Sequence, residues 1–329
     1  MRSCFPTTRR YDRAAPQPSQ GTREPVKSVP TRHILVIVNP AAGGGRGVRR
    51  FETLRGVMEL WHGRLRVRTT SKRGDAERLA TKATADGVSM VVAVGGDGTV
   101  HEVVNGILAT GSDARPALAV VPVGTGCDFA RSLGLPPRAS AAEPRRRVSV
   151  DVGRVRCTTG DGKQERFFLN AANMGASTAA ARRIKDSRLL KRAGVVAYVA
   201  AGLPEVIVRP TTRFVVAEQG AEERTEYLVN LSVCNGPRFG GGLTLAPRAN
   251  LFDGTLHLAQ VGRGSLVSLL RTLSAGYSQP LHTPRGVQVR RVTGLTVDGD
   301  AAIEVDGEIP GRLPAEFTVL PRALEVLLP

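Results

Sequence analysis

The sequence has no long apolar run, few cysteines and few aromatic residues, and each shortage excludes a class of protein. No uninterrupted stretch approaches the ~20 apolar residues that cross a bilayer, so a membrane-spanning protein is excluded. Four scattered cysteines form no CxxC pair and five histidines form neither HxH nor HExxH, which argues against structural zinc and a disulfide scaffold. With 4% aromatic residues there are few stacking platforms, so we expect no nucleic-acid partner.

The charge balance is strongly basic. Lysine and arginine number 46 against 29 acidic residues, which gives a net charge of +17. A basic surface attracts phosphates, anionic lipid headgroups and nucleic acid alike. A bias toward arginine from GC-rich coding is an equally good explanation. No apolar segment near the N-terminus has the pattern of a secretory signal, so we expect a cytoplasmic protein.

The length of 329 residues exceeds the ~100–200 of a typical domain, which predicts two domains. Residues 1–31 are rich in Arg, Pro, Ser and Thr without hydrophobic periodicity and predict a disordered basic arm. Residues 32–144 predict an α/β domain and residues 145–312 a β-sandwich domain. The last strands, within residues 313–329, are expected to return to the first domain.

Buried strands and amphipathic helices alternate in the first domain. Apolar runs at 34–38, 90–94 and 117–123, with an alternating run at 65–69, predict strands of a parallel sheet. Apolar side chains recur at helical spacing between them. These are Phe51, Leu54, Met58 and Trp61, then Ala76, Leu79, Ala80 and Ala83, then Val100, Val103, Val104, Ile107 and Leu108. Thr99 and Glu102 have capping-box spacing. The order predicts a doubly wound nucleotide-binding fold.

Glycine-rich turns follow three of these strands, where open α/β sheets bind ligands. They are 43–47, the GGDGT segment at 95–99 and 124–126. Glycine lets the backbone approach a polyphosphate, and a helix N-terminus favours its charge. Asp97 would repel a bare phosphate unless it acts through Mg²⁺ or orients a nucleophile, which favours phosphoryl transfer. Neither GxGxxG nor GxxxxGK[ST] occurs. Turns that bind nothing are the alternative.

The second domain has short β-runs separated by glycine turns, which predicts an antiparallel sandwich. Predicted strands cover 148–155, 166–170, 213–217, 227–234, 255–261, 286–292 and 302–305, followed by 317–320 and 323–327. A helix is predicted at 189–203, where apolar residues share one face. We expect an ordinary core helix, and the alternative is a wall of a cleft between the domains or a membrane-facing lid.

Five acidic residues, Asp298, Asp300, Glu304, Asp306 and Glu308, lie within eleven positions of a basic chain. If residues 302–308 are extended, Glu304, Asp306 and Glu308 share one face, and a carboxylate there could accept a proton from an attacking hydroxyl. A solvated edge strand with an Asp306-Gly307 turn is the alternative. Asp253 precedes a glycine and could ligate a hard cation, although most Asp-Gly pairs are hairpin turns.

Several segments, in their residues and in their order along the chain, resemble those of the soluble bacterial branch of the diacylglycerol-kinase-like lipid kinases. The segments are Asn39-Pro40 with the following glycines, GGDGTVHEVVNG at 95–106, PVGTGCDFAR at 122–131, GGG at 240–242, the AP…DG run at 246–254 and Asp306-Gly307-Glu308. The resemblance extends from about residue 32 to 329. It implies an ATP-binding α/β domain, a β-sandwich that completes the lipid site, and Mg²⁺-dependent phosphorylation of a lipid hydroxyl, with diacylglycerol as the leading acceptor.

The resemblance also implies roles for individual residues. Glu308, with Asp306 beside it, would accept the proton, and Asp97 would organise the nucleotide and metal. Asp253, with the backbone carbonyls of Asn250 and Thr255, would hold a structural Mg²⁺. The nucleotide would lie against Asn39, Pro40, Ala41, Ala42, Gly43, Thr70, Gly96, Asp97, Gly98, Thr99, Val100, His101, Glu102 and Thr125.

Two positions depart from the family pattern. His101 stands where many bacterial members have Asn, a change we expect to be tolerated. Cys127 replaces the usual Asn before Asp128 and so lacks a hydrogen-bonding side chain. Its thiol is either reactive or, the reading we favour, buried and inert.

The resemblance further implies peripheral association with anionic lipid at the inner face of the membrane, and a homodimer is possible. NAD kinase is the alternative enzyme, since that family shares GGDGT and a later GGG. The residues after GGDGT and the PVGTGCDFAR segment favour the lipid kinases. A catalytically silent nucleotide or lipid sensor is the alternative from another class.

Overall fold

A computed structural model describes residues 33–62, 64–111, 114–124, 126–135, 146–186, 211–278 and 281–329. The first part contains β1 (Ile34–Val38), α1 (Ala42–Gly45), α2 (Gly47–His62), β2 (Leu65–Thr69), α3 (Asp75–Ala85), β3 (Met90–Gly95), α4 (Asp97–Leu108), β4 (Ala117–Pro122) and α5 (Asp128–Ser132). It is followed by β5 (Arg146–Thr159), β6 (Gly162–Phe168), β7 (Ala171–Gly175), α6 (Ala176–Asp186), β8 (Thr212–Glu218), β9 (Arg224–Cys234), β10 (Leu256–Gly262), α8 (Leu266–Ser278), β11 (Val287–Val292), β12 (Gly294–Gly299), β13 (Ala302–Val305) and β14 (Glu308–Leu328). The predicted basic arm and the predicted helix at 189–203 lie outside the described residues.

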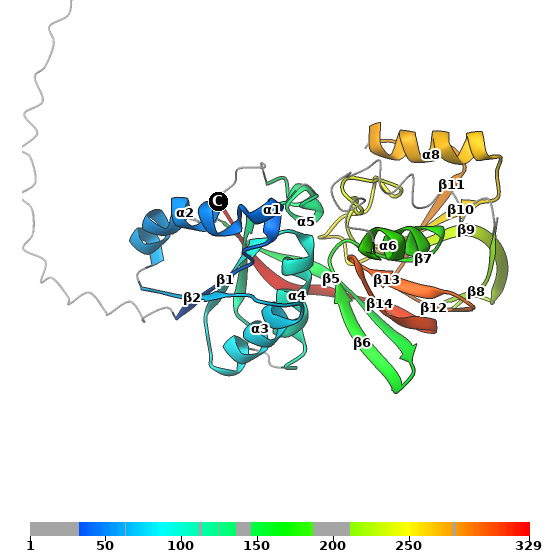
Figure 1. Ribbon diagram of the computed structural model, residues 1–329. Coiled ribbons are helices and arrows are strands. Elements are labelled where there is room, and N and C mark those ends of the chain that lie inside the picture. The colour runs from blue at the N-terminus through cyan, green and yellow to red at the C-terminus, as the bar shows by residue number, and fades with distance from the viewer. Residues whose placement is uncertain are drawn as a thin grey trace, which may run out of the picture. The chain divides into compact units, whose positions relative to one another are not determined.

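The elements β1 to α5 form an α/β lobe around a parallel sheet in the order β4-β3-β1-β2. Ile34 pairs with both Leu65 and Met90, and Met90 pairs with Ala117. Alternate side chains of β1 and β3 pack against α2 on one face and against α3 and α4 on the other (Figure 1). The predicted parallel sheet with helices on both faces is therefore confirmed.

The elements β6 to β13 form a β lobe of mainly antiparallel strands. β10 pairs with β11 and β9, β9 also pairs with β7 and β8, and β13 joins β7 to β14. Its core includes Phe168, Phe214, Leu231, Leu258 and Phe317. The predicted β-rich second part is confirmed. Two strands, β7 and β12, were not predicted, because each is a run of only five or six residues with glycine or polar side chains among its positions.

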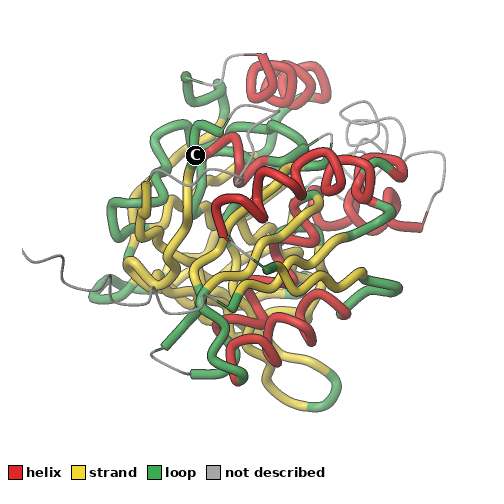
Figure 2. The backbone as a smooth tube through the Cα atoms, turned by 90° about the vertical axis from the view of Figure 1, so that its left-hand side faces the viewer, coloured by secondary structure: helices red, strands yellow, loops and turns green. Residues whose placement is uncertain are grey.

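β5 and β14 are long strands that extend through both lobes. They pair with each other from Leu328–Arg146 to Arg312–Thr158. Within the α/β lobe, Val326 of β14 pairs in parallel with Leu118 of β4. The two predicted final strands are one strand, interrupted by a bulge where the backbone N–H of Arg322 donates to buried Asp151 at 2.8 Å. Figure 2 shows the strands inside and the helices outside them. None of the described helices is long and apolar enough to cross a membrane.

Candidate functional site

A cleft of about 1110 Å³ is lined by residues of both lobes. The α/β lobe contributes the loops after β1, β2, β3 and β4, so the carboxyl ends of the parallel strands open into it. The β lobe contributes segments near residues 170–173, 239–241 and 304–308. Thirteen of the predicted site residues line this cleft: Asn39, Pro40, Ala41, Ala42, Gly43, Thr70, Gly96, Asp97, Gly98, Thr99, Glu102, Asp306 and Glu308.

The loop after β1 is held to the GGDG turn by side-chain hydrogen bonds. The side-chain amide of Asn39 donates to Thr99 Oγ1 at 2.9 Å, and Asn39 Oδ1 accepts from the backbone N–H of Ala41 at 3.0 Å. Gly43 has a left-handed backbone with φ of 59°. A Cβ on Gly47 would lie 2.0 Å from the carbonyl oxygen of Asn39. Glycine is thus required for this tight loop, which keeps its backbone open to the cleft.

The turn after β3 leads directly into α4, which begins at Asp97. A Cβ on Gly95 would lie 2.4 Å from Thr99 Oγ1, so this close approach requires glycine. The predicted capping box of Thr99 and Glu102 is wrong. Thr99 lies inside α4 and does not cap its start, and the Glu102 side chain does not bond back to the start of α4. Glu102 Oε2 accepts instead from the backbone N–H of Ala76 at 3.1 Å and so caps the start of α3. The start of α4 therefore has no side-chain cap, and the backbone N–H groups of Asp97 and Gly98 are left at the cleft.

Asp97 and Asp128 form an acidic pair in the cleft. Asp97 Oδ1 accepts from the backbone N–H of Phe129 at 3.2 Å, and Asp128 Oδ2 accepts from Gly241 of the β lobe at 2.7 Å. Gly126 lies between them, since a Cβ there would be 2.9 Å from Asp97 Oδ2 and 3.9 Å from Asp128 Oδ2. Burial raises the pKa of both carboxyl groups, and the charge of Asp97 raises that of Asp128 further.

Asp306 and Glu308 are placed by a two-residue hairpin turn between β13 and β14. Asp306 and Gly307 have φ of 46° and 92°, and Val305 pairs with Glu308. The predicted extended strand through residue 308 is therefore wrong, because the chain reverses at Asp306-Gly307. The alternative is half right: its Asp306-Gly307 turn is confirmed, but its edge strand is wrong, since β13 is paired on both sides.

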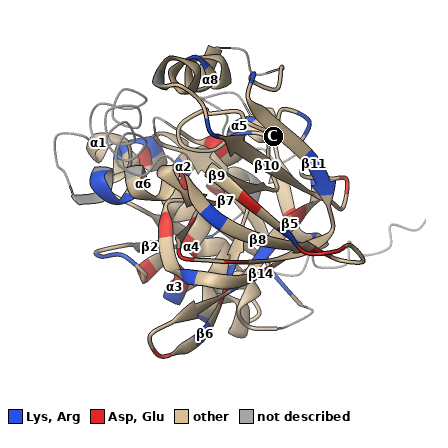
Figure 3. Cartoon of the chain, turned by 90° about the vertical axis from the view of Figure 1, so that its right-hand side faces the viewer, with Lys and Arg blue, Asp and Glu red and all other residues tan. Residues whose placement is uncertain are grey.

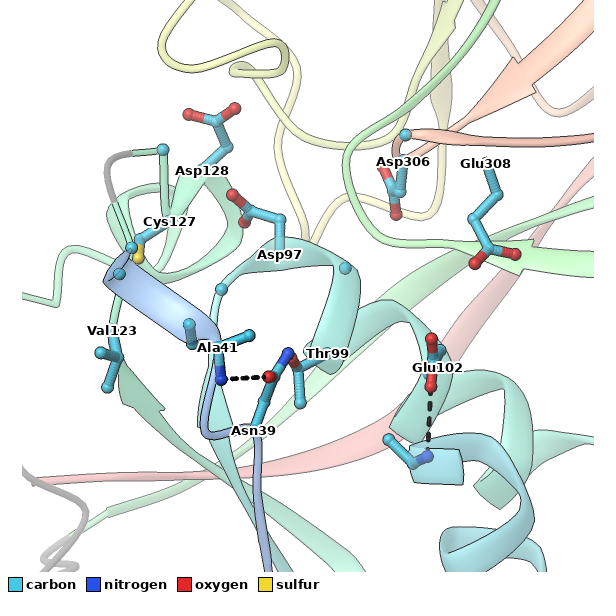
Figure 4. Close-up of a pocket in the computed structure, with 18 of the residues that line it drawn as sticks. Asn39, Ala41, Asp97, Thr99, Glu102, Val123, Cys127, Asp128, Asp306 and Glu308 are labelled. Atoms are coloured by element: carbon cyan, nitrogen blue, oxygen red, sulfur yellow. Dashed lines mark hydrogen bonds between the residues drawn. The ribbon is translucent and has the colours of Figure 1, made fainter. Parts of the chain in front are cut away.

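The Asp306 carboxylate anchors the backbone of the β lobe. It accepts from three successive backbone N–H groups, at 2.7 Å from Leu169, 3.1 Å from Asn170 and 3.1 Å from Ala171. Three amide donors satisfy most of the hydrogen-bonding capacity of a carboxylate. Asp306 thus fixes the hairpin that carries Glu308, while Glu308 itself faces the cleft (Figure 4).

Glu308 lies between two cationic side chains of the α/β lobe. Its Oε1 is 2.8 Å from the Arg73 guanidinium, and its Oε2 is 3.6 Å from His101 Nε2. Burial of Glu308 opposes its charge, but the contacts with His101 and then Arg73 lower its pKa to about 2. Glu308 is therefore ionised at neutral pH and able to accept a hydrogen bond from a hydroxyl.

His101 is buried beneath this pair, with 2% of its surface exposed. Its Nδ1 lies 3.6 Å from Asp306 Oδ2, and its Nε2 lies 3.3 Å from the side-chain amide of Asn105. Burial would lower the pKa of the imidazole, but the carboxylates of Asp306 and then Glu308 outweigh it and raise the pKa to about 9. A positive imidazolium therefore joins the two carboxylates at neutral pH.

Glu304 adds a third acidic group at the β-lobe side of the cleft, beside Asp306 and Glu308. Its Oε2 accepts from the side-chain amide of Asn173 at 2.6 Å, and its Oε1 accepts from the backbone N–H of Gly307. Burial, assisted by the charge of Asp306, raises the pKa of Glu304 to about 7. Because Asn173 and Glu304 both line the cleft, this end offers polar groups to a substrate headgroup.

Comparisons with known proteins agree with this arrangement. Residues 33–155 match the diacylglycerol kinase catalytic domain, and residues 170–328 match the YegS C-terminal NAD kinase beta sandwich-like domain. A protein of Cronobacter sakazakii named "Probable lipid kinase YegS-like" is 30% identical over 84% of this chain and 92% of its own length. A protein of the same name from Klebsiella pneumoniae is 31% identical over 80% and 86%. The chain belongs to the YegS-like family of diacylglycerol-kinase-like lipid kinases.

The fold of this lipid kinase family member also matches solved structures. "A putative diacylglycerol kinase" from Bacillus anthracis superimposes with a TM-score of 0.72 at 22% identity, covering 91% of this chain and 97% of the other. A second crystal structure from that organism gives a TM-score of 0.74 at 21% identity, covering 91% and 95%. These likenesses support the two-part architecture.

Some residues predicted for the lipid kinase site lie outside the cleft lining. Val100 and His101 are buried behind it in α4, and Thr125 falls outside the described residues. Asn250, Asp253 and Thr255 lie in a loop before β10. Asp253 Oδ1 accepts from the backbone N–H and hydroxyl of Thr255 at 3.1 and 2.8 Å, and Oδ2 is 3.3 Å from Arg291. Protein donors thus contact both carboxylate oxygens, and a structural Mg²⁺ at this loop stays a prediction.

Cleft residues that the sequence reasoning did not assign come from three places. Asp128 was inside the quoted PVGTGCDFAR segment, which was a sufficient signal. No local pattern in the sequence indicated Arg73, because its partner Glu308 lies 235 positions away. The positions of the β-lobe groups Asn170, Asn173 and Gly241 in the cleft depend on how β7 and the 239–241 loop meet the α/β lobe.

In the described chain no cluster of three or more His, Cys, Asp or Glu side chains is arranged to hold a metal.

Cys127 also lines the cleft of this lipid kinase. Burial, and then the charge of Asp97, raises the pKa of its thiol to about 11, so it is protonated at neutral pH. This agrees with the inert cysteine that the sequence favoured. Its φ of 50° is a left-handed conformation that Asn tolerates better than other side chains, which gives a physical reason for the usual Asn.

Proposed function

We propose that this protein transfers the γ-phosphate of ATP to a lipid hydroxyl, with diacylglycerol as acceptor and phosphatidic acid as product. The observation that carries the proposal is the position of Glu308. The β lobe presents this ionised carboxylate to the same cleft that the glycine turns of the α/β lobe open into. A phosphate donor held by the turns and an acceptor hydroxyl beside Glu308 would face each other across the cleft (Figure 4).

In this mechanism the chain's own groups position the donor and take the proton. Backbone N–H groups of Gly43 and Gly44, and of Asp97 and Gly98 at the start of α4, bind the phosphates. As the hydroxyl oxygen forms its bond to the γ-phosphorus, its proton passes to Glu308, and the bond from the γ-phosphorus to the bridging oxygen breaks to release ADP. His101 and Arg73 hold Glu308 in place.

The acidic pair fits a divalent cation. Asp128 Oδ1 is buried and accepts no hydrogen bond from the described residues, and a guanidinium nitrogen of Arg131 is 3.8 Å away. The raised pKa of Asp97 and Asp128 marks a place where added positive charge would stabilise both carboxylates. Asp97 and Asp128 would hold Mg²⁺, which when bound neutralises charge on the nucleotide phosphates.

The test is ATP-dependent transfer of labelled γ-phosphate to lipids in mixed micelles, with NAD as a parallel acceptor. Asp97→Asn and Glu308→Gln are each expected to reduce kcat at least about a hundredfold. Glu316→Gln, which removes an exposed carboxylate from the same strand as Glu308, is the matched control and keeps full activity. Labelled NADP would assign the alternative enzyme, and ATP binding without any labelled product would assign a silent sensor.

We further propose that the enzyme meets its acceptor as a peripheral protein at an anionic membrane surface. Two features support this. The net charge of +17 favours contact with anionic lipid, and a diacylglycerol acceptor is present only in the bilayer. Vesicle binding that weakens with added salt and requires anionic lipid would support the proposal, whereas equal binding to neutral vesicles would contradict it.

A further inference from the structure

Helix α8 is attached to the loop that lines the β-lobe side of the cleft. The Tyr277 hydroxyl donates to the carbonyl oxygen of Gly240 at 2.9 Å. The carbonyl oxygen of Gly276 accepts from the backbone N–H of Thr244 at 3.0 Å. A Cβ on Gly276 would lie 2.7 Å from Leu243 Cδ1, so the helix and the loop are in direct contact. The inner face of α8 therefore supports the loop that lines the cleft.

The outer face of α8 carries apolar and basic side chains. Val267 is 56% exposed, Arg271 follows one turn later on the same face, and Leu281 just beyond the helix is 84% exposed. Single exposed apolar side chains are common on protein surfaces, so these two are informative only together with the charge around them. α8 lies on the outside of the β lobe (Figure 1).

The charge around α8 is of one sign. Residues 254–297 contain five arginines and no aspartate or glutamate. Arg290 and Arg291 pair with acidic residues elsewhere in the fold. The other three, Arg263, Arg271 and Arg285, are exposed and form no ion pair with the described residues. Figure 3 shows α8 without acidic residues.

This combination fits an anionic lipid surface better than a protein partner. Apolar side chains that enter the headgroup region, with Lys or Arg beside them, are typical of protein surfaces that lie in the membrane interface. Protein interfaces of stable complexes have a packed central cluster, often aromatic. The exposed face of α8 instead has one aliphatic side chain, Val267, among Arg271 and serines, with Leu281 beyond the end of the helix.

We propose that the outer face of α8, with Val267, Arg271, Leu281 and the flanking Arg263 and Arg285, is the surface by which this protein docks on anionic membrane. The proposal rests on the proposed function, because a lipid acceptor must reach the cleft from that membrane. The docked helix would hold the Phe239–Leu243 loop at the bilayer.

Two hydrogen bonds connect α8, through the Phe239–Leu243 loop, to the acidic pair of Asp97 and Asp128. α8 holds the carbonyl of Gly240 through Tyr277, and the next residue, Gly241, donates to Asp128 in the α/β lobe. A membrane bound by α8 therefore borders the cleft rather than a remote face. A lipid acceptor would need to travel only past the Phe239–Gly241 loop to reach Glu308, since both line the same cleft.

Vesicle sedimentation with the full-length protein tests the surface directly. Vesicles are made of phosphatidylcholine with or without phosphatidylglycerol. The double variant Val267→Asp with Leu281→Asp is expected to lower the partition coefficient on anionic vesicles at least about tenfold, and Arg271→Gln about fivefold. Leu60→Asp, at a residue 86% exposed on α2, is the matched control and binds like wild type.

Two results would overturn the proposal. One is a partition coefficient on anionic vesicles that equals that of wild type for both the double variant and Arg271→Gln. The other is a loss of vesicle binding in Leu60→Asp as large as that in the α8 variants. Sedimentation velocity is run on the same samples. A dimer that dissociates in the α8 variants while vesicle binding is unchanged would show that the face is a subunit interface.

A kinetic comparison separates this proposal from the proposed function. The α8 variants should keep wild-type kcat on a short-chain, water-soluble diacylglycerol and lose at least about tenfold in rate on vesicle-borne diacylglycerol. Equal rates on vesicles would contradict the docking surface. A wild-type protein that phosphorylates neither acceptor would refute the proposed function, and the vesicle-binding experiment would still decide the role of α8.

Discussion

Replacing His101 with glutamine should remove a pH-dependent contribution to stability. The imidazole is buried against Asp306 and Glu308, and these carboxylates raise its pKa from 6.5 to about 9. A rise of about 2.5 pH units at about 1.4 kcal/mol each corresponds to about 3 to 4 kcal/mol. Because the folded state has the higher pKa, this stabilisation is complete below pH 6.5 and is lost as pH rises through 9.

Urea unfolding of wild type and His101→Gln between pH 6 and about pH 10 measures this contribution. The groups facing the imidazole are Asp306, Glu308 and Asn105, with Arg73 and Glu304 beyond them. All of these are present in both proteins, so the difference between the two curves reports the charge of His101 together with its coupling to Glu304, whose pKa of about 7 that charge lowers. We expect the free energy of unfolding of wild type to fall about 3 to 4 kcal/mol more than that of the variant across this range. Parallel curves would refute the assignment of a charged His101.

Three further substitutions test the roles of individual cleft residues. Asp306→Asn should lower the free energy of unfolding by about 2 to 3 kcal/mol, because three backbone amides lose a charged acceptor, and urea unfolding measures it. Arg73→Gln should raise the pKa of Glu308, so the acidic limb of the pH profile of kcat/KM moves to higher pH; an unmoved limb would exclude the contact from the working enzyme. Cys127→Asn should stabilise the protein by about 1 kcal/mol, since Asn tolerates a φ of 50°, and a lower urea midpoint would contradict this.

The α/β lobe was predictable because its signals are local. An apolar run, a glycine turn and an amphipathic helix lie within about 20 residues, and parallel pairing of β1, β3 and β4 then brings their turns to one edge. The Asn39 loop and the GGDG turn could therefore be placed together from sequence alone. The capping box failed because Glu102 has a partner from another helix, Ala76, and local spacing carries no information about such a contact.

The β-lobe part of the site was less predictable because its contacts are distant in sequence. The cluster of acidic residues indicated a functional site, but its three carboxylates have different surroundings. Glu304 contacts an amide side chain, Asp306 accepts from three backbone N–H groups, and Glu308 lies between two cations. Which carboxylate faces the cleft depends on the reversal at Asp306-Gly307. The motif pointed to Glu308, but the anchoring role of Asp306 needed the register of β13 and β7.

The long β5–β14 ladder has a consequence for synthesis on the ribosome. β4 obtains its outer neighbour only when Val326 arrives to pair with Leu118, so the sheet of the α/β lobe stays open at that edge until the last residues emerge. Contacts of such separation slow folding and leave apolar strand edges exposed. The nascent chain cannot complete its lobes one after the other. Instead, the two lobes close in a single late event when the final strand is inserted between β4, β5 and β13.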